Sequence, residues 1–203
     1  FGVGHLFLAL AEKYNGGIID AIRALAQAVD AVGPVFPVTL QQTDLCVELS
    51  NGKKITGEHE IDRPEWDRSI RIKRAWLHPS VDIYERAKRE ILSADVIIIG
   101  PGSFYTSIIA TLLPQGVREA IGQTKAKIIF VSGNAIECNG ETGPTSTSEI
   151  IDILHTYLPR EVDMVVSNSH KLDSIQSAYY QEKRWERIII NTEKVTVPII
   201  SAP

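Results

Sequence analysis

Apolar residues recur at helical spacing over the first thirty residues of this chain. One apolar stripe begins at Leu6 and ends before Asn15-Gly16-Gly17, a sequence that commonly terminates a helix. A second stripe begins at Ile18 and runs to Val29, and Gly33-Pro34 stops it. The pattern predicts two consecutive helices at the start of the chain.

From residue 35 to residue 79 the pattern changes to short strand-like stretches. Asn51-Gly52 lies between two of them and favours a tight hairpin, because both residues tolerate positive φ. The charged run from Glu58 to Arg74 contains both signs and is interpreted as a solvated hairpin or flap rather than a nucleic-acid patch. Strands are expected at 35–40, 45–49, 54–58 and around 70–75, the last ending at His78-Pro79.

Beyond residue 80 short apolar runs alternate with amphipathic stretches. Apolar runs without polar alternation, separated by helices, are typical of a parallel sheet covered on both faces. The predicted strands are 95–99, 127–131, 162–166 and 187–190, and the predicted helices are 84–92, 105–113, 115–122, 146–158 and 172–180. The expected fold class is α/β: a Rossmann-like, doubly wound, mostly parallel sheet with helices on both faces and a β-hairpin insertion.

Length and composition narrow the class of protein. With 203 residues, 44% hydrophobic and 23% charged, the chain is expected to form a single α/β domain over 1–203, with 40–78 as the hairpin or flap insertion. The net charge of -4 argues against a protein that binds the nucleic-acid backbone. Two cysteines are too few for a disulfide framework or for a zinc site built from cysteines. No apolar run reaches the ~20 residues of a membrane span. A soluble, cytoplasmic protein is expected.

Small and hydroxyl residues follow the predicted strands, at the edge where ligands bind in sheets of this type. The sharpest loop follows the strand 95–99. Gly100 and Gly102 let the backbone approach a ligand closely, and the next helix is expected to point free N–H groups at the same place. Ser103, Thr106 and Ser107 add hydroxyl donors. The pattern favours a phosphate or diphosphate, and a plain strand–helix turn with a Ser or Thr cap stays open as the alternative.

The other strand exits add further candidates. Asn134 follows the strand 127–131, Thr39 follows the strand 35–40, and Glu141 lies between glycines in the next loop. Glu141 is a candidate ligand of a divalent cation or a ribose hydroxyl, and Asp44 is a candidate metal ligand; a solvated loop acid and a turn acid are the plain alternatives. No G-x-S-x-G elbow or H-E-x-x-H motif occurs in the sequence, so acyl-transfer chemistry has no support.

The run ADVIIIGPGSFYTSII at 94–109 resembles the signature of a known family. This is the CofD-like superfamily (UPF0052), which contains the 2-phospho-L-lactate transferases and the gluconeogenesis factors. Further segments resemble the family in the same order, at 4–9, 37–39, 57–61, 77–79 and 140–142. The resemblance covers residues 4–195.

Two loops favour one branch of this family. Gly-Pro-Gly-Ser-x-Tyr-Thr-Ser at 100–107 and Gly-Glu-Thr at 140–142 look like the gluconeogenesis-factor branch, whereas the transferase branch usually has Gly-Pro-Ser-Asn at the first loop. The favoured branch implies a cytoplasmic regulator that binds nucleotides, with affinity for UDP-sugars, linked to carbon metabolism and to cell-wall or cell-shape control. The alternative branch implies a Mg²⁺-dependent 2-phospho-L-lactate transferase of coenzyme F420 biosynthesis. Whether the chain catalyses a reaction stays open.

The resemblance also adds residues to the candidate site. A late Tyr of the favoured branch maps onto Tyr180, with Tyr179 one residue away; Tyr105 belongs to the branch-specific loop, and His5 stands where the family has an asparagine. The family opens with a strand and a Gly-Gly-Thr-Gly phosphate loop, so its N-terminal Gly-rich βα unit is expected to be missing from this chain. The expected nucleotide- or phosphate-binding residues are Gly100, Gly102, Ser103, Tyr105, Thr106, Ser107, Thr39, Asn134, Glu141, Tyr180 and His5.

The sequence therefore predicts a nucleotide or nucleotide-sugar ligand, no nucleic-acid partner and no membrane span. The amides of Gly102 and Ser103 would hold the diphosphate, while Glu141 and Asn134 would orient ribose, sugar or a cation. Mg²⁺, with Glu141 and Asp44 as its candidate ligands, is the cofactor considered. A homo-oligomer stays open, and a partner-binding module without nucleotide affinity is the third reading.

Overall fold

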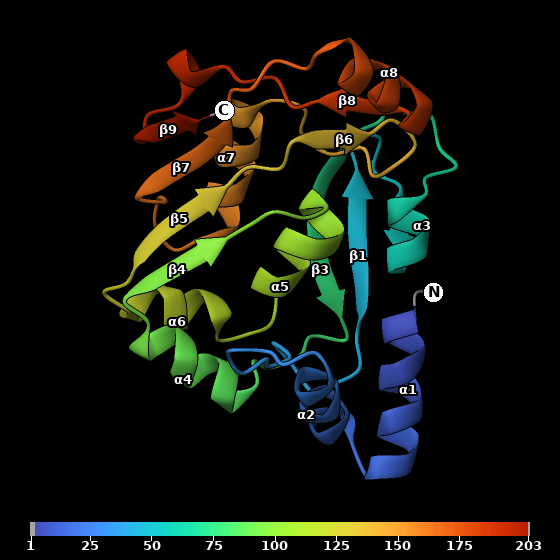
Figure 1. Ribbon diagram of the computed structural model, residues 1–203, viewed down its shortest axis with the longest axis vertical. Helices are drawn as coiled ribbons and strands as arrows, with labels where there is room; N and C mark the ends of the chain where they lie inside the picture. Colours follow the sequence, from blue (N-terminus) through green and yellow to red (C-terminus); the bar gives the residue numbers. More distant parts are fainter. Residues whose placement is uncertain (1–2, 203) are drawn as a thin grey trace.

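A computed structural model describes residues 3–202, and within this range it leaves the side chains of His5 and Asn15 undescribed. Three sheets organise the described chain: a four-stranded sheet β4-β5-β7-β9, a three-stranded sheet β2-β1-β3 and a two-stranded sheet β6-β8 (Figure 1). The strands are β1 Asp44–Leu49, β2 Lys54–Thr56, β3 Ile72–His78, β4 Val96–Ile99, β5 Lys127–Val131, β6 Ala135–Glu137, β7 Met164–Asn168, β8 Trp185–Arg187 and β9 Ile199–Ala202. The α-helices are α1 Val3–Asn15, α2 Ile18–Ala28, α3 Glu58–Asp62, α4 Glu85–Ser93, α5 Ala110–Leu112, α6 Val117–Gln123, α7 Thr147–Tyr157 and α8 Ser174–Lys183.

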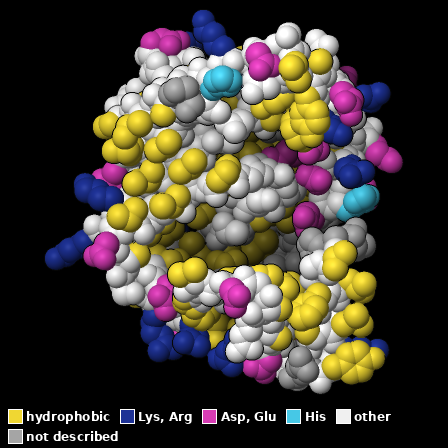
Figure 2. All heavy atoms as spheres, in the orientation of Figure 1, with side chains coloured by type: hydrophobic (Ala, Val, Ile, Leu, Met, Phe, Trp, Pro, Cys, Tyr) yellow, Lys and Arg dark blue, Asp and Glu magenta, His cyan; other side chains and the backbone are white. Residues whose placement is uncertain are grey.

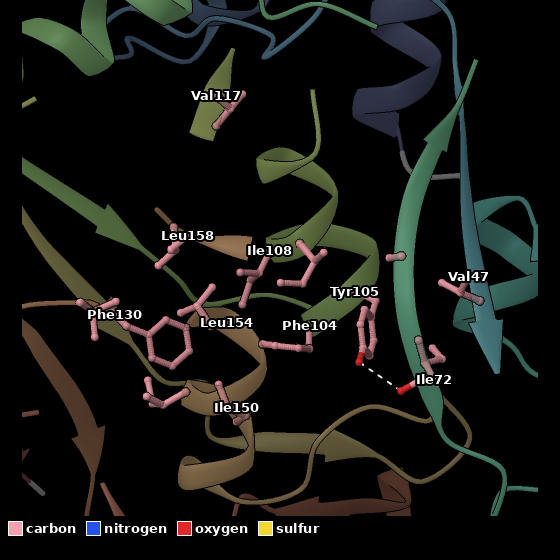
Figure 3. Packing of buried hydrophobic residues seen from close by; sticks show 14 of the residues in the cluster. Val47, Ile72, Phe104, Tyr105, Ile108, Val117, Phe130, Ile150, Leu154 and Leu158 are labelled. Carbon is pink, nitrogen blue, oxygen red and sulfur yellow. Dashed lines mark hydrogen bonds between the residues drawn. The ribbon is translucent and has the colours of Figure 1, made fainter. Parts of the chain in front are cut away.

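The four-stranded sheet is parallel throughout, as the fully apolar strand sequences predict. Ile128, Phe130 and Val165 on one of its faces are buried. Their side chains belong to the main apolar cluster, in which Phe130 packs with Ile150 and Leu154 of α7 (Figure 3). The expected α/β fold class, a mostly parallel sheet with helices and an antiparallel hairpin, is confirmed.

The opposite face of the parallel sheet is apolar and open to solvent in the described residues. Val96 and Ile98 of β4 are 48% and 67% exposed, and Ile200 of β9 is 50% exposed. Figure 2 shows hydrophobic side chains gathered over this sheet, beside a hollow near the centre of the molecule. Successive side chains of a strand point to opposite faces of a sheet, so neighbouring residues of one strand are in turn buried against the core and exposed to solvent.

The predicted hairpin at Asn51-Gly52 is confirmed. β1 and β2 are antiparallel, with Val47 opposite Ile55, and Gly52 has φ of 86°. The Asn51 side chain accepts a hydrogen bond from the Lys53 amide at 3.0 Å and so fixes the turn. β3 completes the sheet on the other side of β1, which agrees with the strand expected to end at His78-Pro79.

Three other expectations about elements are corrected. No strand forms at 35–40, because Pro34 and Pro37 have no N–H to donate to a ladder; the Val38 carbonyl instead accepts the Tyr84 amide at 2.7 Å. The strand expected at 187–190 is β8, which lies at 185–187 and pairs antiparallel with β6. β9, which sequence patterning missed, is the fourth strand of the parallel sheet.

The helix expected at 105–113 is also different from its prediction. Residues Phe104–Ile109 form a π-helical segment, and α5 adds one short α-helical turn after it. π-helical geometry is rare and occurs frequently at functional sites. None of the helices in the described range is long and apolar enough to cross a membrane.

Asp163 ties the start of β7 to β5. Its carboxylate accepts hydrogen bonds from the Ile128 amide at 2.9 Å, from Lys127 Nζ at 2.8 Å and from Arg160 Nη1 at 2.9 Å. The Ile128 amide first, and then the two cationic side chains, hold the pKa of Asp163 well below its ordinary value. The charged form is therefore favoured in the folded protein.

Replacing Asp163 is expected to lower stability in a pH-dependent way. A carboxyl with a depressed pKa stabilises the fold at neutral pH, and this contribution is lost as the pH falls below about 4. Asp163→Asn should lower the free energy of unfolding by about 2 kcal/mol at pH 7, and the difference from wild type should shrink between pH 5 and pH 3. Urea unfolding at several pH values measures this, with the exposed Asp152→Asn as control. A difference that stays constant down to pH 3 would contradict the assignment.

Candidate functional site

A cavity of about 250 Å³ lies at the carboxyl ends of β4 and β5. Gly102 and Ser103, which follow β4, form one wall, and Gly133, which follows β5, forms another. Trp185 of β8 closes a further side. This is the edge at which ligands bind in open parallel sheets, so the cavity is the candidate functional site.

The loop after β4, residues 100–107 (the β4 loop), is held close to β5. Gly100 has φ of 147°, and a Cβ atom placed there would lie 2.4 Å from the Val131 carbonyl oxygen. Only glycine fits this position without strain. Within the described residues the Gly102 and Ser103 amides donate no hydrogen bond, which leaves two N–H groups at the cavity wall.

The side chain of Glu141 forms hydrogen bonds with the backbone amides at the start of the π-helical segment. Its carboxylate accepts the Tyr105 N–H at 3.0 Å and the Thr106 N–H at 3.1 Å. The expectation that this helix start offers free N–H groups to a ligand is therefore wrong for these two amides. Burial first, and the nearby Asp62 charge to a smaller extent, raise the pKa of Glu141, although the amide donors act in the opposite direction.

The segment that carries Glu141, residues 140–143 (the glycine loop), is fixed from the antiparallel side of the molecule. Arg68 Nη1 donates to the Gly140 carbonyl at 2.7 Å, and Arg71 donates to the Thr142 and Gly143 carbonyls. Trp66 Nε1 donates to Thr142 Oγ1 at 3.3 Å. The charged run that sequence patterning interpreted as a solvated flap thus positions one wall of the cavity.

The structure separates several predicted site residues from the cavity. The Tyr105 side chain is only 1% exposed, and its hydroxyl donates to the Ile72 carbonyl at 3.2 Å (Figure 3). Gly100 and Ser107 line a neighbouring, mostly apolar hollow together with Val38. Thr39, next to Val38, uses its hydroxyl to accept the Gln41 amide.

Other predicted residues lie at or near the cavity. Glu141 lines it directly, and the exposed Asn134 stands between Gly133 and Ala135, which both do. The Tyr180 ring meets the Trp185 ring edge-on, with centroids 5.7 Å apart, and so reaches the cavity through Trp185. His5 belongs to α1, but its side chain lies outside the described residues.

The two candidate metal ligands do not lie together. Asp44 begins β1 opposite His78, whereas Leu49 at the far end of β1 pairs with Ile72, whose amide donates to the Thr142 carbonyl beside Glu141. Six residues of strand place the two acids about 17 Å apart along the sheet. In the part of the chain that the structure describes, no group of three or more His, Cys, Asp or Glu side chains could hold a metal ion.

Among the cavity-lining residues that sequence reasoning missed are two acids and an aromatic residue: Asp62, Glu137 and Trp185. Asp62 lies in the charged run and Glu137 in the unpredicted strand β6, so neither stood at an expected strand exit. Trp185 was interpreted as a packing residue. A sequence signal for Trp185 did exist, since it follows Tyr179 and Tyr180 closely, and clustered aromatic residues often form ligand sites.

Comparison with known proteins places this geometry in a family. The family described as "2-phospho-L-lactate transferase CofD" matches residues 2–203. A "Putative gluconeogenesis factor" of Thermotoga maritima is 32% identical over 201 residues, which cover 99% of this chain and 62% of the relative. A "Gluconeogenesis factor" of Halalkalibacterium halodurans is 32% identical over 196 residues, covering 95% of this chain and 59% of the relative.

A solved structure agrees with these relatives. The crystal structure of a UPF0052 family member from Bacillus halodurans superposes with a TM-score of 0.87 at 28% identity, covering 100% of this chain and 66% of that protein. The chain spans 62% and 59% of the length of the two curated relatives named above. The match over nearly all of its residues shows that the chain belongs to the CofD family, with relatives named gluconeogenesis factors.

Proposed function

We propose that this chain is a nucleotide-sugar-binding regulator of carbon metabolism and of cell-wall or cell-shape control, acting in the cytoplasm. The observation that carries the proposal is the cavity at the ends of β4 and β5, where the amides of Gly102 and Ser103 are free to donate. Backbone amides close to a glycine suit the oxygens of a diphosphate. The names of the curated relatives support the link to carbon metabolism.

The ligand would lie across the cavity in an extended form. Its diphosphate would meet the Gly102 and Ser103 amides, and its neighbouring groups would meet Trp185 and the carboxylates on the opposite wall. Tyr180 would act through Trp185, whose ring it meets edge-on. In this arrangement Glu141 holds the β4 loop and does not ligate the nucleotide.

The alternative is a Mg²⁺-dependent 2-phospho-L-lactate transferase, as the description of the family suggests. Asp44 and Glu141 do not fit a shared magnesium site. Asp44 begins β1, whereas Glu141 belongs to a loop that lies beside the other end of that strand. A guanine nucleotide that binds only with Mg²⁺ would favour this alternative over the regulator.

Calorimetric titration of the chain with UDP-N-acetylglucosamine tests the proposal. Binding is expected without Mg²⁺, while GDP, with or without Mg²⁺, should bind much more weakly. Tyr180→Ala should weaken UDP-N-acetylglucosamine binding by about tenfold, because the ring that supports Trp185 is lost. Tyr14→Ala, which removes an exposed ring of α1, is the matched control and should leave binding unchanged.

Two results would contradict the proposal. If no nucleotide sugar gave a binding signal, a partner-binding module would be favoured instead. Normal binding by the Tyr180→Ala variant would show that the site does not extend to Trp185.

A further inference from the structure

The walls of the cavity have an unusual balance of charge. Asp62, Glu137 and Glu141 contribute carboxylates, and none of the described lining residues is Lys or Arg. The rest of the wall is mainly apolar, with Phe104, Phe130 and Trp185 as its aromatic rings. A wall of this composition disfavours a negatively charged ligand group that lies directly beside these carboxylates.

Two of these carboxylates are free to meet a ligand. Glu141 uses its oxygens to accept the Tyr105 and Thr106 amides. Among the described residues, Asp62 and Glu137 form no ion pair and accept no side-chain hydrogen bond. Gly140 lies close to both residues, since a Cβ atom at Gly140 would lie 3.1 Å from Glu137 Cβ and 3.9 Å from the Asp62 carbonyl oxygen.

Trp185 supplies a flat apolar surface on the same cavity. Tyr179 and Tyr180 hold it edge-on, with ring centroids at 5.8 Å and 5.7 Å from the Trp185 ring. An indole face packs against the C–H face of a sugar ring, and carboxylates accept hydrogen bonds from its hydroxyl groups. At about 250 Å³ the cavity holds roughly eight water volumes, enough for one such ring.

Among the residues that the structure describes, basic side chains lie near the cavity but do not line it. Arg63 and Arg68 line an adjacent hollow, which shares the lining residues Asp62 and Glu137 with the cavity. Arg68 donates a hydrogen bond to the Gly140 carbonyl. Neither arginine lines the cavity itself. Asp62 and Glu137 therefore line both the cavity and the hollow that contains these two arginines.

We propose that this cavity holds the sugar of a nucleotide sugar and selects an uncharged, hydroxyl-rich ring over one that carries a carboxylate. Asp62 and Glu137 are the specificity-determining residues, and Trp185 is the platform. The inference rests on the proposed function and deepens it, because it assigns the sugar class and the residues that recognise it.

The test compares two ligands that differ only at C6 of the sugar. Calorimetric titration at pH 7.5 is expected to give a Kd for UDP-glucuronic acid about tenfold or more above that for UDP-glucose, because its carboxylate would lie beside those of Asp62 and Glu137. In the double variant Asp62→Asn/Glu137→Gln, the Kd for UDP-glucuronic acid should exceed that for UDP-glucose by about threefold or less. Glu119→Gln, at an exposed position of α6, removes the same kind of charge elsewhere and should leave the ratio of the two Kd values unchanged.

The outcomes separate the two proposals. If UDP-glucuronic acid binds as tightly as UDP-glucose to the wild-type chain, the sugar selection is wrong while nucleotide-sugar binding stands. If both bind with the expected ratio and the double variant keeps that ratio, Asp62 and Glu137 are not its source and the inference is overturned. If neither binds, the proposed function fails and the inference fails with it.

Discussion

Gly100→Ala is expected to destabilise the protein by about 4 kcal/mol and to abolish nucleotide-sugar binding. The new Cβ would lie 2.4 Å from the Val131 carbonyl oxygen, at a backbone φ of 147° that side chains rarely adopt. The clash is with the backbone of the neighbouring strand, so no side-chain rotation relieves it. β4 must move away from β5, or the β4 loop must change its course. Either movement displaces Gly102 and Ser103 from the cavity wall.

Thermal unfolding measures the first effect. A loss of about 4 kcal/mol corresponds to a fall in Tm of roughly 10 °C for a chain of this size. Gly133→Ala is the matched control at the next strand exit, where the added Cβ meets only the end of the Ile188 side chain at 3.6 Å. It should change the stability by less than about 1 kcal/mol. Similar Tm values for the two variants would refute the close approach of Gly100 to β5.

Glu141→Ala is expected to lower the free energy of unfolding by about 3 kcal/mol. The change removes the acceptor of the Tyr105 and Thr106 amides and leaves both N–H groups without a partner. It also frees the glycine loop from the π-helical segment, although Arg68 and Arg71 still hold its carbonyls. The affinity for UDP-N-acetylglucosamine should fall together with stability, since the β4 loop loses its support.

Two further variants separate this role from a general effect of charge. Glu141→Gln retains one carbonyl oxygen as an acceptor and should recover part of the stability. Glu149→Ala removes a more exposed carboxylate that accepts the Thr145 amide at 2.8 Å, and should cost about 1 kcal/mol. Chemical denaturation of the three variants provides the comparison. If Glu149→Ala proved as costly as Glu141→Ala, the two amides would not be the source of the effect.

The parallel sheet was predictable because its strands are short, apolar and separated by helical patterns. The hairpin at Asn51-Gly52 was predictable for a local reason, as its turn residues favour positive φ. β6 and β9 were not, because each has only three or four residues and owes its strand conformation to a distant partner. The segment 35–40 contains β-branched residues, but Pro37 prevents it from joining a ladder.

The candidate site also contains residues that could be predicted from the sequence and residues that could not. Gly102, Ser103 and Glu141 were predictable because they follow strands whose carboxyl ends share one edge of the sheet. The role of Glu141 as the acceptor of two helix-start amides was not, because it depends on how the glycine loop crosses to the β4 loop. Asp62 comes to the cavity from the antiparallel part of the molecule, a tertiary contact that no local pattern encodes.

β4 has a further consequence for the behaviour of this chain in solution. It is an end strand of its sheet in the described residues, and Val96–Ile99 contains neither a charge nor a proline. Natural edge strands usually carry such features, which prevent a free row of N–H and C=O groups from pairing with another molecule. With Val96 and Ile98 also exposed, this edge presents a row of N–H and C=O groups beside an apolar surface. β4 is therefore suited to pair with a further β-strand.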